Sequence, residues 1–245
     1  MIKAISFDLY NTLVQFWPPL DEIQQAACRE LGLNVSKSDL TRGYAVADVY
    51  FNQENADQPL SLRSEDRRLE FFARYEQIIL ENAGLTVTLA LAKQIWQMAM
   101  SVPKDFVAFE DAIPALSTLQ AQGYRLGVLS NLRRDMDALC ERLGLAPYLD
   151  FCISPEDAGE EKPHAPMFLA ALERASVTAK ETVHVGDQYK SDVLGARAVG
   201  IHGVLLDRGG WLTKITDCPK ISSLSELESL LAGAPQSLAF NDHKD

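Results

Sequence analysis

The sequence has few cysteines, no long apolar run and no excess of basic residues. Its four cysteines show no Cys-x-x-Cys spacing, so neither a zinc site nor a disulfide framework is indicated. No apolar run approaches the roughly 20 residues that a membrane-spanning helix needs. The first residues follow a strand pattern rather than that of a signal peptide. We therefore expect a protein of a reducing, cytoplasmic setting, with no membrane partner.

The charge balance is acidic. Lysine and arginine number 23 against 34 aspartates and glutamates, which gives a formal net charge of -11 at pH 7. Such a chain repels polyanions, so nucleic acid is not an expected partner. The 245 residues, of which 47% are hydrophobic, are enough to bury a core as one large domain or as a domain with an insertion.

A short apolar run near the start of the chain ends abruptly in an acid. Ala4 to Phe7 contains β-branched and aromatic residues, which is typical of a buried parallel strand, and Asp8 follows it directly. Ligands of open parallel α/β sheets bind at the carboxyl ends of the strands. Asp8 is therefore placed for chemistry, although an aspartate can also serve only as the cap of a turn.

The rest of the chain divides into a helical block and an alternating region. Residues 15–101 show helical periodicity almost throughout, with a break expected from Gln53 to Pro59. Beyond them, short apolar runs alternate with helical segments, which predicts a doubly wound parallel α/β sheet. We expect a core domain of residues 1–14 and 102–232, a helical insert of residues 15–101 and a frayed tail of residues 233–245. The five expected strands are Ala4–Phe7, Arg125–Leu129, Asp150–Ile153, Thr182–Val185 and Gly203–Leu206.

Polar groups follow the predicted strands or precede a helix in a fixed order. They are Asp8 with Thr12, Ser130 with Asn131, Lys162 with Pro163, and Asp187 with Asp192. This ordered set resembles the four motifs of the haloacid dehalogenase-like hydrolase superfamily, over Met1 to about Leu231. The helical block matches the cap that one branch of that superfamily, subfamily I, inserts after its first motif. The resemblance implies a Rossmann-like core with an inserted α-helical cap.

The resemblance gives each residue a role that suits its chemistry. Asp8 is the expected nucleophile, forming a covalent ester with the group that it attacks. Thr12 and Ser130 are suited to donate hydrogen bonds to phosphate oxygens, and Lys162 to neutralise the nucleophile and the transferring group. Asn131 either joins the phosphate-binding set or orients its neighbours. Taken singly, such residues are more often caps, turn formers or solvated surface groups.

Converging carboxylates also indicate a cation. Asp8, Asp187 and Asp192 would repel one another strongly unless a cation or a proton is shared, and hard oxygen ligands suit Mg²⁺. In the superfamily the metal is held by the nucleophile, by the backbone carbonyl two residues later and by the first late acid. These positions correspond here to Asp8, Tyr10 and Asp187. Asp192 would act directly, through water or by orienting Lys162, or would only begin its helix.

Tyr10 departs from the pattern of the superfamily's phosphatases. They usually carry a second aspartate at this position, as the acid that protonates the leaving group. General acid–base assistance is typically worth about 10²- to 10⁴-fold in rate. The sequence therefore predicts a slow phosphatase of small phosphorylated metabolites, or one restricted to good leaving groups. We expect a monomer or a homodimer.

Tyrosine at this position is instead typical of the superfamily's 2-haloacid dehalogenases, which makes carbon–halogen hydrolysis the alternative. Arg42 in the helical block could bind substrate as the cap arginine of those enzymes, or be an ordinary surface arginine. Against this, GDQYKSD is the acidic, metal-binding type of fourth motif, and Phe168 and Asn11 replace residues usual in dehalogenases. The mixture resembles the subgroup of rhythmically-expressed-gene-like and haloacid-dehalogenase-domain-containing proteins. A non-catalytic protein that binds phosphate and Mg²⁺ is the third interpretation.

Overall fold

The chain folds into two compact units. The structure, a computed structural model, describes residues 1–58 and 60–233. One unit combines residues 1–15 with the chain from Phe106 onward, and the other is Phe16–Asp105. These limits lie within a few residues of the predicted division, whereas the predicted tail falls almost entirely outside the described residues. No helix in the described ranges is long and apolar enough to cross a bilayer.

The core unit is built on a parallel sheet with the strand order β5-β4-β1-β6-β7-β8. This confirms the predicted doubly wound α/β fold, with β1 inside the sheet and apolar neighbours on both sides. The prediction of five strands was too low, because β8 is a two-residue strand without a periodic pattern. The strands are β1 (Ala4–Phe7), β4 (Arg125–Leu129), β5 (Phe151–Ile153), β6 (Thr182–Gly186), β7 (His202–Leu206) and β8 (Lys220–Ile221).

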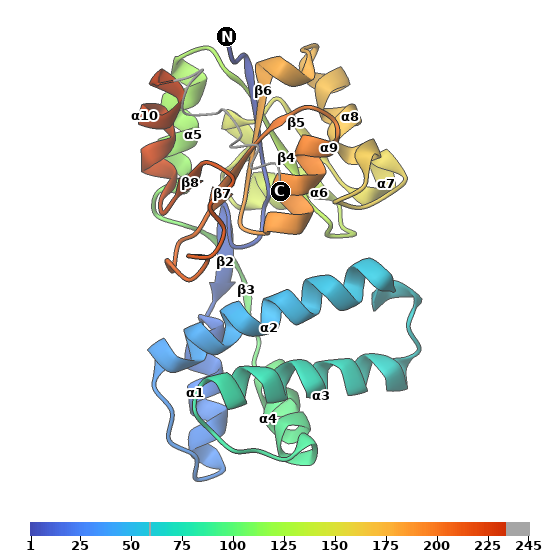
Figure 1. Ribbon diagram of the computed structural model, residues 1–245, viewed down its shortest axis with the longest axis vertical. Coiled ribbons are helices and arrows are strands. Elements are labelled where there is room, and N and C mark those ends of the chain that lie inside the picture. Colours follow the sequence, from blue (N-terminus) through green and yellow to red (C-terminus); the bar gives the residue numbers. More distant parts are fainter. Residues whose placement is uncertain (59, 234–245) are drawn as a thin grey trace. The chain divides into compact units, whose positions relative to one another are not determined.

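Helices cover both faces of this sheet (Figure 1). Helices α5 and α10 pack together on one face, and α8 and α9 pack together on the other. Buried side chains of α8, among them Met167 and Phe168, form a core with Leu129 and Ile153 of the sheet. The core helices are α5 (Ala112–Ala121), α6 (Met136–Arg142), α7 (Pro155–Ala158), α8 (Ala165–Ala175), α9 (Gly195–Ala198) and α10 (Leu227–Ala232).

The register of the three adjacent strands β4, β1 and β6 determines where the site can form. Phe7 of β1 pairs with Val128 of β4 and with Val185 of β6. The next residues, at the carboxyl ends of all three strands, therefore lie at one edge of the sheet. This alignment brings the segments that carry Asp8, Ser130 and Asp187 side by side.

A second, two-stranded sheet was not predicted. It pairs β2 (Val14–Trp17) with β3 (Asp105–Ala108), and the division between the two units falls inside both strands. Each strand has only four residues, and its partner is far away in the sequence, so neither shows a local signal.

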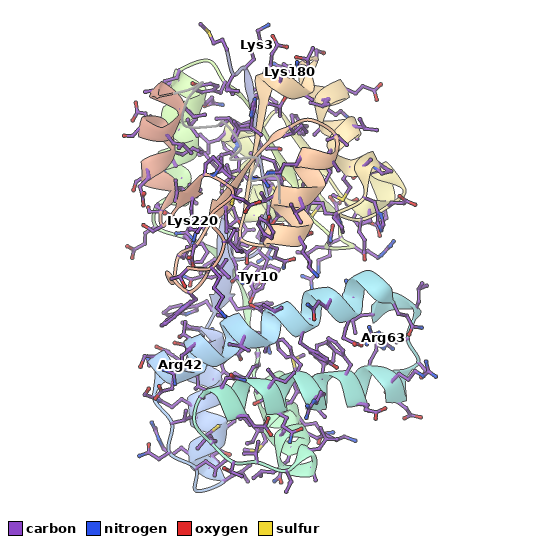
Figure 2. The ribbon with its side chains drawn as sticks, viewed as in Figure 1. Lys3, Tyr10, Arg42, Arg63, Lys180 and Lys220 are labelled. Atoms are coloured by element: carbon purple, nitrogen blue, oxygen red, sulfur yellow. The ribbon has the colours of Figure 1, made fainter. Side chains whose placement is uncertain are left out.

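The helical unit contains α1 (Leu20–Glu30), α2 (Lys37–Asp57), α3 (Glu65–Asn82) and α4 (Leu89–Ser101). Ser36, Ser64 and Thr88 cap the last three helices by accepting hydrogen bonds from backbone amides of the first turn. The expected break from Gln53 was wrong, because α2 continues to Asp57. The buried Arg63 side chain (labelled in Figure 2) stabilises this end by donating to the Gln58 carbonyl at 3.0 Å. Its guanidinium lies over the Phe71 ring, 4.8 Å from the ring centroid.

Candidate active site

Asp8 lies directly after β1, in a tight turn. Its backbone amide donates to the Val185 carbonyl at 2.8 Å, which continues the pairing with β6 by one residue. The chain then turns sharply, with Asn11 in the left-handed region at φ 61°, and the amides of Leu13 and Val14 both donate to the Leu9 carbonyl. The turn therefore places the Asp8 carboxylate at the sheet edge, where its side chain is 14% exposed.

Lys162 connects this carboxylate to a second one. Its Nζ donates to Oδ1 of Asp8 at 2.7 Å and to Oδ1 of Asp192 at 2.8 Å, and its side chain is almost fully buried. The Asn131 side chain holds the Lys162 backbone through two bonds: Nδ2 donates to the Lys162 carbonyl, and Oδ1 accepts from the Lys162 amide. The structure thus favours the orienting role for Asn131 over phosphate binding.

The charges of this trio depend on one another. Burial by itself lowers the pKa of Lys162, but the Asp192 and Asp8 carboxylates outweigh it and hold that pKa above its usual range. Burial raises the pKa of Asp8 to about 6, against the opposing effect of Lys162. Burial also disfavours ionised Asp192, yet Lys162 holds the pKa of Asp192 well below normal. The buried lysine therefore keeps Asp192 ionised.

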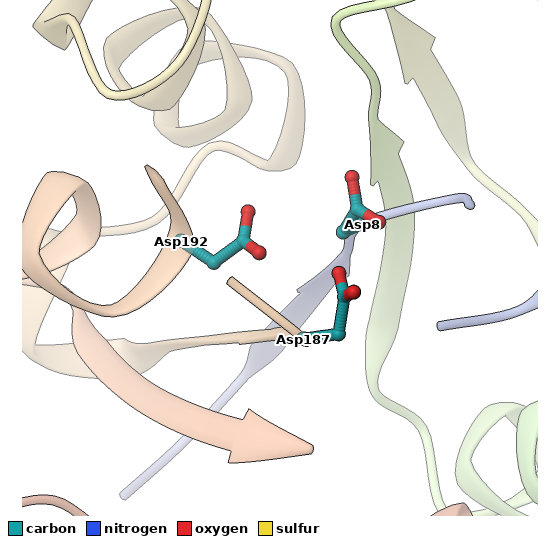
Figure 3. Close-up of side chains that lie close together, drawn as sticks. All are labelled: Asp8, Asp187 and Asp192. Carbon is teal, nitrogen blue, oxygen red and sulfur yellow. The ribbon is translucent and has the colours of Figure 1, made fainter. Parts of the chain in front are cut away.

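Three carboxylates converge at this edge of the sheet (Figure 3). Asp8, Asp187 and Asp192 each have a carboxylate oxygen within 4.8 Å of the others. Asp187 follows β6, and Asp192 belongs to a π-helical turn, Tyr189–Leu194. Oxygen atoms at such spacing suit a hard divalent cation such as Mg²⁺, which would also relieve the repulsion between the acids. The donor set therefore fits the metal that the sequence analysis predicts.

Several neighbouring groups hold Asp192 in place. Its Oδ2 accepts from the Gln188 amide at 2.9 Å, and its Oδ1 lies 3.3 Å from Nε2 of His184 in addition to the bond from Lys162. A side chain on Gly186 would have its Cβ only 2.2 Å from the Asp192 carboxylate, so this glycine is needed for the close approach. These contacts favour the role of Asp192 in orienting Lys162.

Thr12 and Ser130 supply hydroxyl groups at the same edge. Thr12 is fully buried, and its Oγ1 has no hydrogen-bond partner among the described residues. Ser130 is also buried, and its Oγ accepts from the Leu132 amide at 3.2 Å, which leaves its own proton for donation. An unpaired buried hydroxyl is rare in folded proteins, and the Thr12 hydroxyl is free to donate to an anionic group.

The other two predicted residues have different surroundings. Tyr10 is half-buried, with its ring 5.9 Å from the Phe106 ring, and no carboxylate stands at its position. Arg42 belongs to α2 of the helical unit, is half-exposed, and forms an ion pair with Asp39 at 2.8 Å (Figure 2). The partners described for Arg42 lie within its own unit, so its predicted contact with substrate stays a prediction.

Sequence reasoning missed three residues that support the site. Ser6 and His184 both lie inside strands, where Ser6 Oγ is 2.8 Å from Nδ1 of His184. Arg208 follows β7, donates to the Thr12 carbonyl at 2.8 Å and forms a bidentate ion pair with Asp111 at 2.9 Å. The available signals were Ser6 and His184, each a polar residue inside an otherwise apolar strand.

Comparisons with known proteins agree on the family. The model of the haloacid dehalogenase-like hydrolases matches residues 2–200. Ribulose-1,5-bisphosphate 5-phosphatase of Halopiger xanaduensis is 32% identical over 212 residues, which cover 84% of this chain and 85% of that protein. Human haloacid dehalogenase-like hydrolase domain-containing protein 3 is 30% identical over 210 residues, with coverage of 84% and 82%.

A solved structure extends the comparison to the fold. The 2-haloacid dehalogenase of Pseudomonas syringae pv. Tomato DC3000 is 30% identical and superimposes with a TM-score of 0.53, covering 95% of this chain and 99% of that one. The matches confirm the predicted family and the hydrolase class, and the phosphatase names among the relatives favour phosphatase over dehalogenase. Together with the parallel sheet and the acidic edge described above, they lead to one conclusion: this chain belongs to the haloacid dehalogenase-like hydrolase family.

Proposed function

We propose that this protein is a Mg²⁺-dependent phosphatase of small phosphorylated metabolites, with Asp8 as its nucleophile. The observation that carries the proposal is the buried Lys162, which contacts both Asp8 and Asp192 at one edge of the sheet. A lysine in this place neutralises negative charge where a phosphoryl group would transfer. The relatives named as phosphatases of ribulose bisphosphate and glyceraldehyde 3-phosphate support a substrate of this class.

The reaction would proceed in two displacements. A carboxylate oxygen of Asp8 attacks phosphorus, the bond from phosphorus to the ester oxygen breaks, and that oxygen leaves with the bonding electrons. Water then attacks the aspartyl phosphate, releasing inorganic phosphate and restoring Asp8. The hydroxyls of Thr12 and Ser130 would donate to the phosphoryl oxygens, and Lys162 would balance their charge.

The residues proposed to hold Mg²⁺ are Asp8, the Tyr10 carbonyl and Asp187, while Asp192 acts mainly by orienting Lys162. When bound, the metal supplies positive charge that lets a phosphate dianion approach the Asp8 carboxylate. The proposal rests on the convergence of the acids within 4.8 Å. We further propose that residues 15–101 form a specificity cap and that the protein acts in the cytoplasm as a monomer or homodimer.

Tyr10 sets the expected limit on the rate. A phenol has a pKa near 10, so it is a weaker proton donor than a carboxylic acid. The ester oxygen must therefore leave without efficient protonation, which favours substrates whose leaving groups are already good. We expect slow turnover of alkyl phosphates and faster turnover of aryl and acyl phosphates.

The proposal is tested by measuring phosphate release from esters graded by leaving-group quality, with Mg²⁺ and with a chelator. Turnover should need Mg²⁺, should be abolished in Asp8→Asn, and should depend steeply on the leaving group. Tyr10→Asp should flatten this dependence and raise the rate on poor leaving groups by about 10-fold or more. Absence of phosphate release from every ester, with vanadate or phosphate still bound, would instead identify a non-catalytic binding protein.

The second candidate, hydrolysis of 2-haloacids, is favoured by Tyr10 and by the 30% identity to a solved protein named a 2-haloacid dehalogenase. Displacement of halide needs no protonation of the leaving group. Halide release from 2-chloropropionate that persists in a chelator would support this candidate. Strict dependence on Mg²⁺ would exclude it, because attack of Asp8 on carbon needs no metal to offset a phosphate charge.

A further inference from the structure

A row of buried polar groups runs behind the site, through two strands of the sheet. Ser6 of β1 pairs with His184 of β6, and Ser6 Oγ lies 2.8 Å from Nδ1 of the ring. The other ring nitrogen, Nε2, lies 3.3 Å from Oδ1 of Asp192. All three residues are almost completely inaccessible to solvent. A polar chain of this kind inside an otherwise apolar sheet requires an explanation, because unpaired polar atoms there are costly.

We infer that His184 is a positioning residue: its Nε2–H holds the Asp192 carboxylate so that Lys162 stays divided between Asp192 and Asp8. This inference rests on the proposed function of Asp8 and Lys162, and it adds two residues, Ser6 and His184, to the group that makes this function possible.

Asp8 and Asp192 compete for one ammonium group. Lys162 donates to Asp8 at 2.7 Å and to Asp192 at 2.8 Å, so two carboxylates share its charge. Asp192 is the more deeply buried of the two, and without a further donor on its Oδ1 atom it would draw the ammonium group towards itself. His184 Nε2–H is a second donor to the same Oδ1 atom, and it weakens the attraction of Asp192 for the ammonium group. Lys162 is then able to remain close to the nucleophile.

The Ser6 hydroxyl can donate to Nδ1 of His184 or accept from it across their 2.8 Å contact. We assign it as the donor, which leaves the ring hydrogen at Nε2, facing Asp192. Ser6 lies in β1, two residues before Asp8. Ser6 thus joins the nucleophile's own strand to the group that holds the opposing carboxylate.

The first test reads the ring directly and does not depend on turnover. In ¹⁵N-histidine NMR of the full chain, which has four histidines, loss of a signal in His184→Gln identifies His184. We expect hydrogen at Nε2, and in Ser6→Ala a shift of the signal towards hydrogen at Nδ1. A ring that carries hydrogen at Nδ1 and none at Nε2 in the natural protein would overturn the inference.

The second test compares two amides of different reach. His184→Gln can place an N–H near the position of Nε2, whereas His184→Asn reaches only the position of Nδ1. We expect kcat to fall by about 10- to 100-fold in His184→Asn, the scale of a lost hydrogen bond to a charged group, with KM changed by less than about 2-fold. His184→Gln should recover most of the loss. Equal losses in both variants, or no loss in either, would contradict a positioning role.

A matched control lies on the same strand. Thr182 of β6 is buried, and its hydroxyl donates to the Thr178 carbonyl at 3.0 Å, away from Asp192. Thr182→Val removes a buried hydrogen bond and should therefore reduce stability. Its kcat should stay within about 2-fold of that of the natural protein, because this hydroxyl does not contact Asp192. If the natural protein turns over no ester, the proposed function fails, while the NMR experiment still decides the role of His184.

Discussion

Both units of the molecule bury carboxyl groups, but within the described residues a lysine contacts those of the core, whereas Glu76 and Asp48 of the helical unit accept from neutral groups. Asp192 in the core contacts Lys162 at 2.8 Å. In the helical unit, Glu76 on α3 is 1% exposed and accepts a hydrogen bond from the neutral Gln24 amide. Burial raises the pKa of Glu76 to about 8, whereas Lys162 holds the pKa of Asp192 well below its usual value. Burial raises the pKa of both carboxyl groups, and at Asp192 the charge of Lys162 outweighs this effect.

This difference separates structural acids from reactive ones. A protonated Glu76 packs within the helical unit as a neutral hydrogen-bonding group, at little electrostatic cost. Asp192 keeps its charge, and the geometry that holds this charge also places Lys162 next to Asp8. We expect changes in the core to affect mainly turnover, and changes in the helical unit to affect mainly stability and its dependence on pH.

The largest effect is expected from removing the cation of the core. Lys162→Met leaves Asp8 and Asp192 buried together without a positive charge, so the pKa of both carboxyl groups should rise, as that of Glu76 does. Turnover of the best ester should fall by at least about 10²-fold, the scale of losing one charge-stabilising donor. Lys190→Met, an exposed lysine in the same segment as Asp192, is the control and should stay within about 2-fold. Near-normal turnover in Lys162→Met would show that the lysine is structural only.

The next largest effect is expected on stability, at Glu76, for which the structure describes no contact with a cation. Because folding raises the pKa of Glu76 from 4.5 to about 8, the folded state binds the proton more tightly. Stability from this group is therefore complete below pH 4.5 and is lost as the pH rises towards 8. Glu76→Gln should be nearly neutral at pH 5 and stabilising by a few kcal/mol at pH 9, since one pKa unit corresponds to about 1.4 kcal/mol.

Urea unfolding at both pH values measures this change, with Glu81→Gln, an exposed residue of the same helix, as the control. A Glu76→Gln variant that is equally destabilised at pH 5 and pH 9 would show that Glu76 acts as an ordinary charged residue. The proposed difference in protonation between the buried acids of the two units would then be wrong.

A smaller effect is expected at Asp48 of α2, which accepts from the Tyr75 hydroxyl at 2.6 Å. Burial raises the pKa of Asp48 to about 6, and the Tyr75 bond opposes this rise. Tyr75→Phe should therefore raise this pKa further and cost about 1 to 2 kcal/mol at pH 8, where Asp48 is ionised, but less at pH 5. Thermal unfolding at the two pH values checks the prediction, and a larger loss at pH 5 would reverse the assigned sign.

The smallest stability effect is expected at Arg42. Its ion pair with Asp39 is exposed, and such pairs contribute little to folding, so Arg42→Ala should leave the Tm almost unchanged. The informative quantity is KM. A rise of about 10-fold with an unchanged Tm would identify Arg42 as a substrate-binding residue of the cap, and an unchanged KM would leave it as a surface arginine.

The sequence was sufficient for the parts of the fold that depend on local pattern. The apolar runs that became β1, β4, β5, β6 and β7 are interrupted by helical segments, and this alternation limits the topology strongly. Strands β2 and β3 were missed because each has only four residues and its partner is distant in the chain, and β8 was missed because two residues show no periodic pattern. The end of α2 was misplaced because the Arg63 side chain, itself outside the helix, bonds to the Gln58 carbonyl there.

The site residues also fall into those that local pattern predicts and those that depend on contacts between distant segments. Asp8, Lys162 and Asp187 follow strands or precede a helix, so their order along the chain was enough to predict that they converge. The Ser6–His184 pair depends on the register between β1 and β6, and a sequence alone does not reveal register. Arg208 was missed for a related reason, since it supports the Thr12 carbonyl from a loop that follows another strand.

The buried hydroxyl of Thr12 has a consequence for the evolution of this protein. Valine has nearly the same shape as threonine but no hydroxyl group, and would remove an unsatisfied polar atom from the interior. In a lineage that is selected only for a stable fold, we therefore expect valine to replace threonine at this position. A lineage that loses the need for its ligand should accumulate such a change early. The residue at position 12 should thus distinguish relatives that still bind the ligand from relatives that keep only the fold.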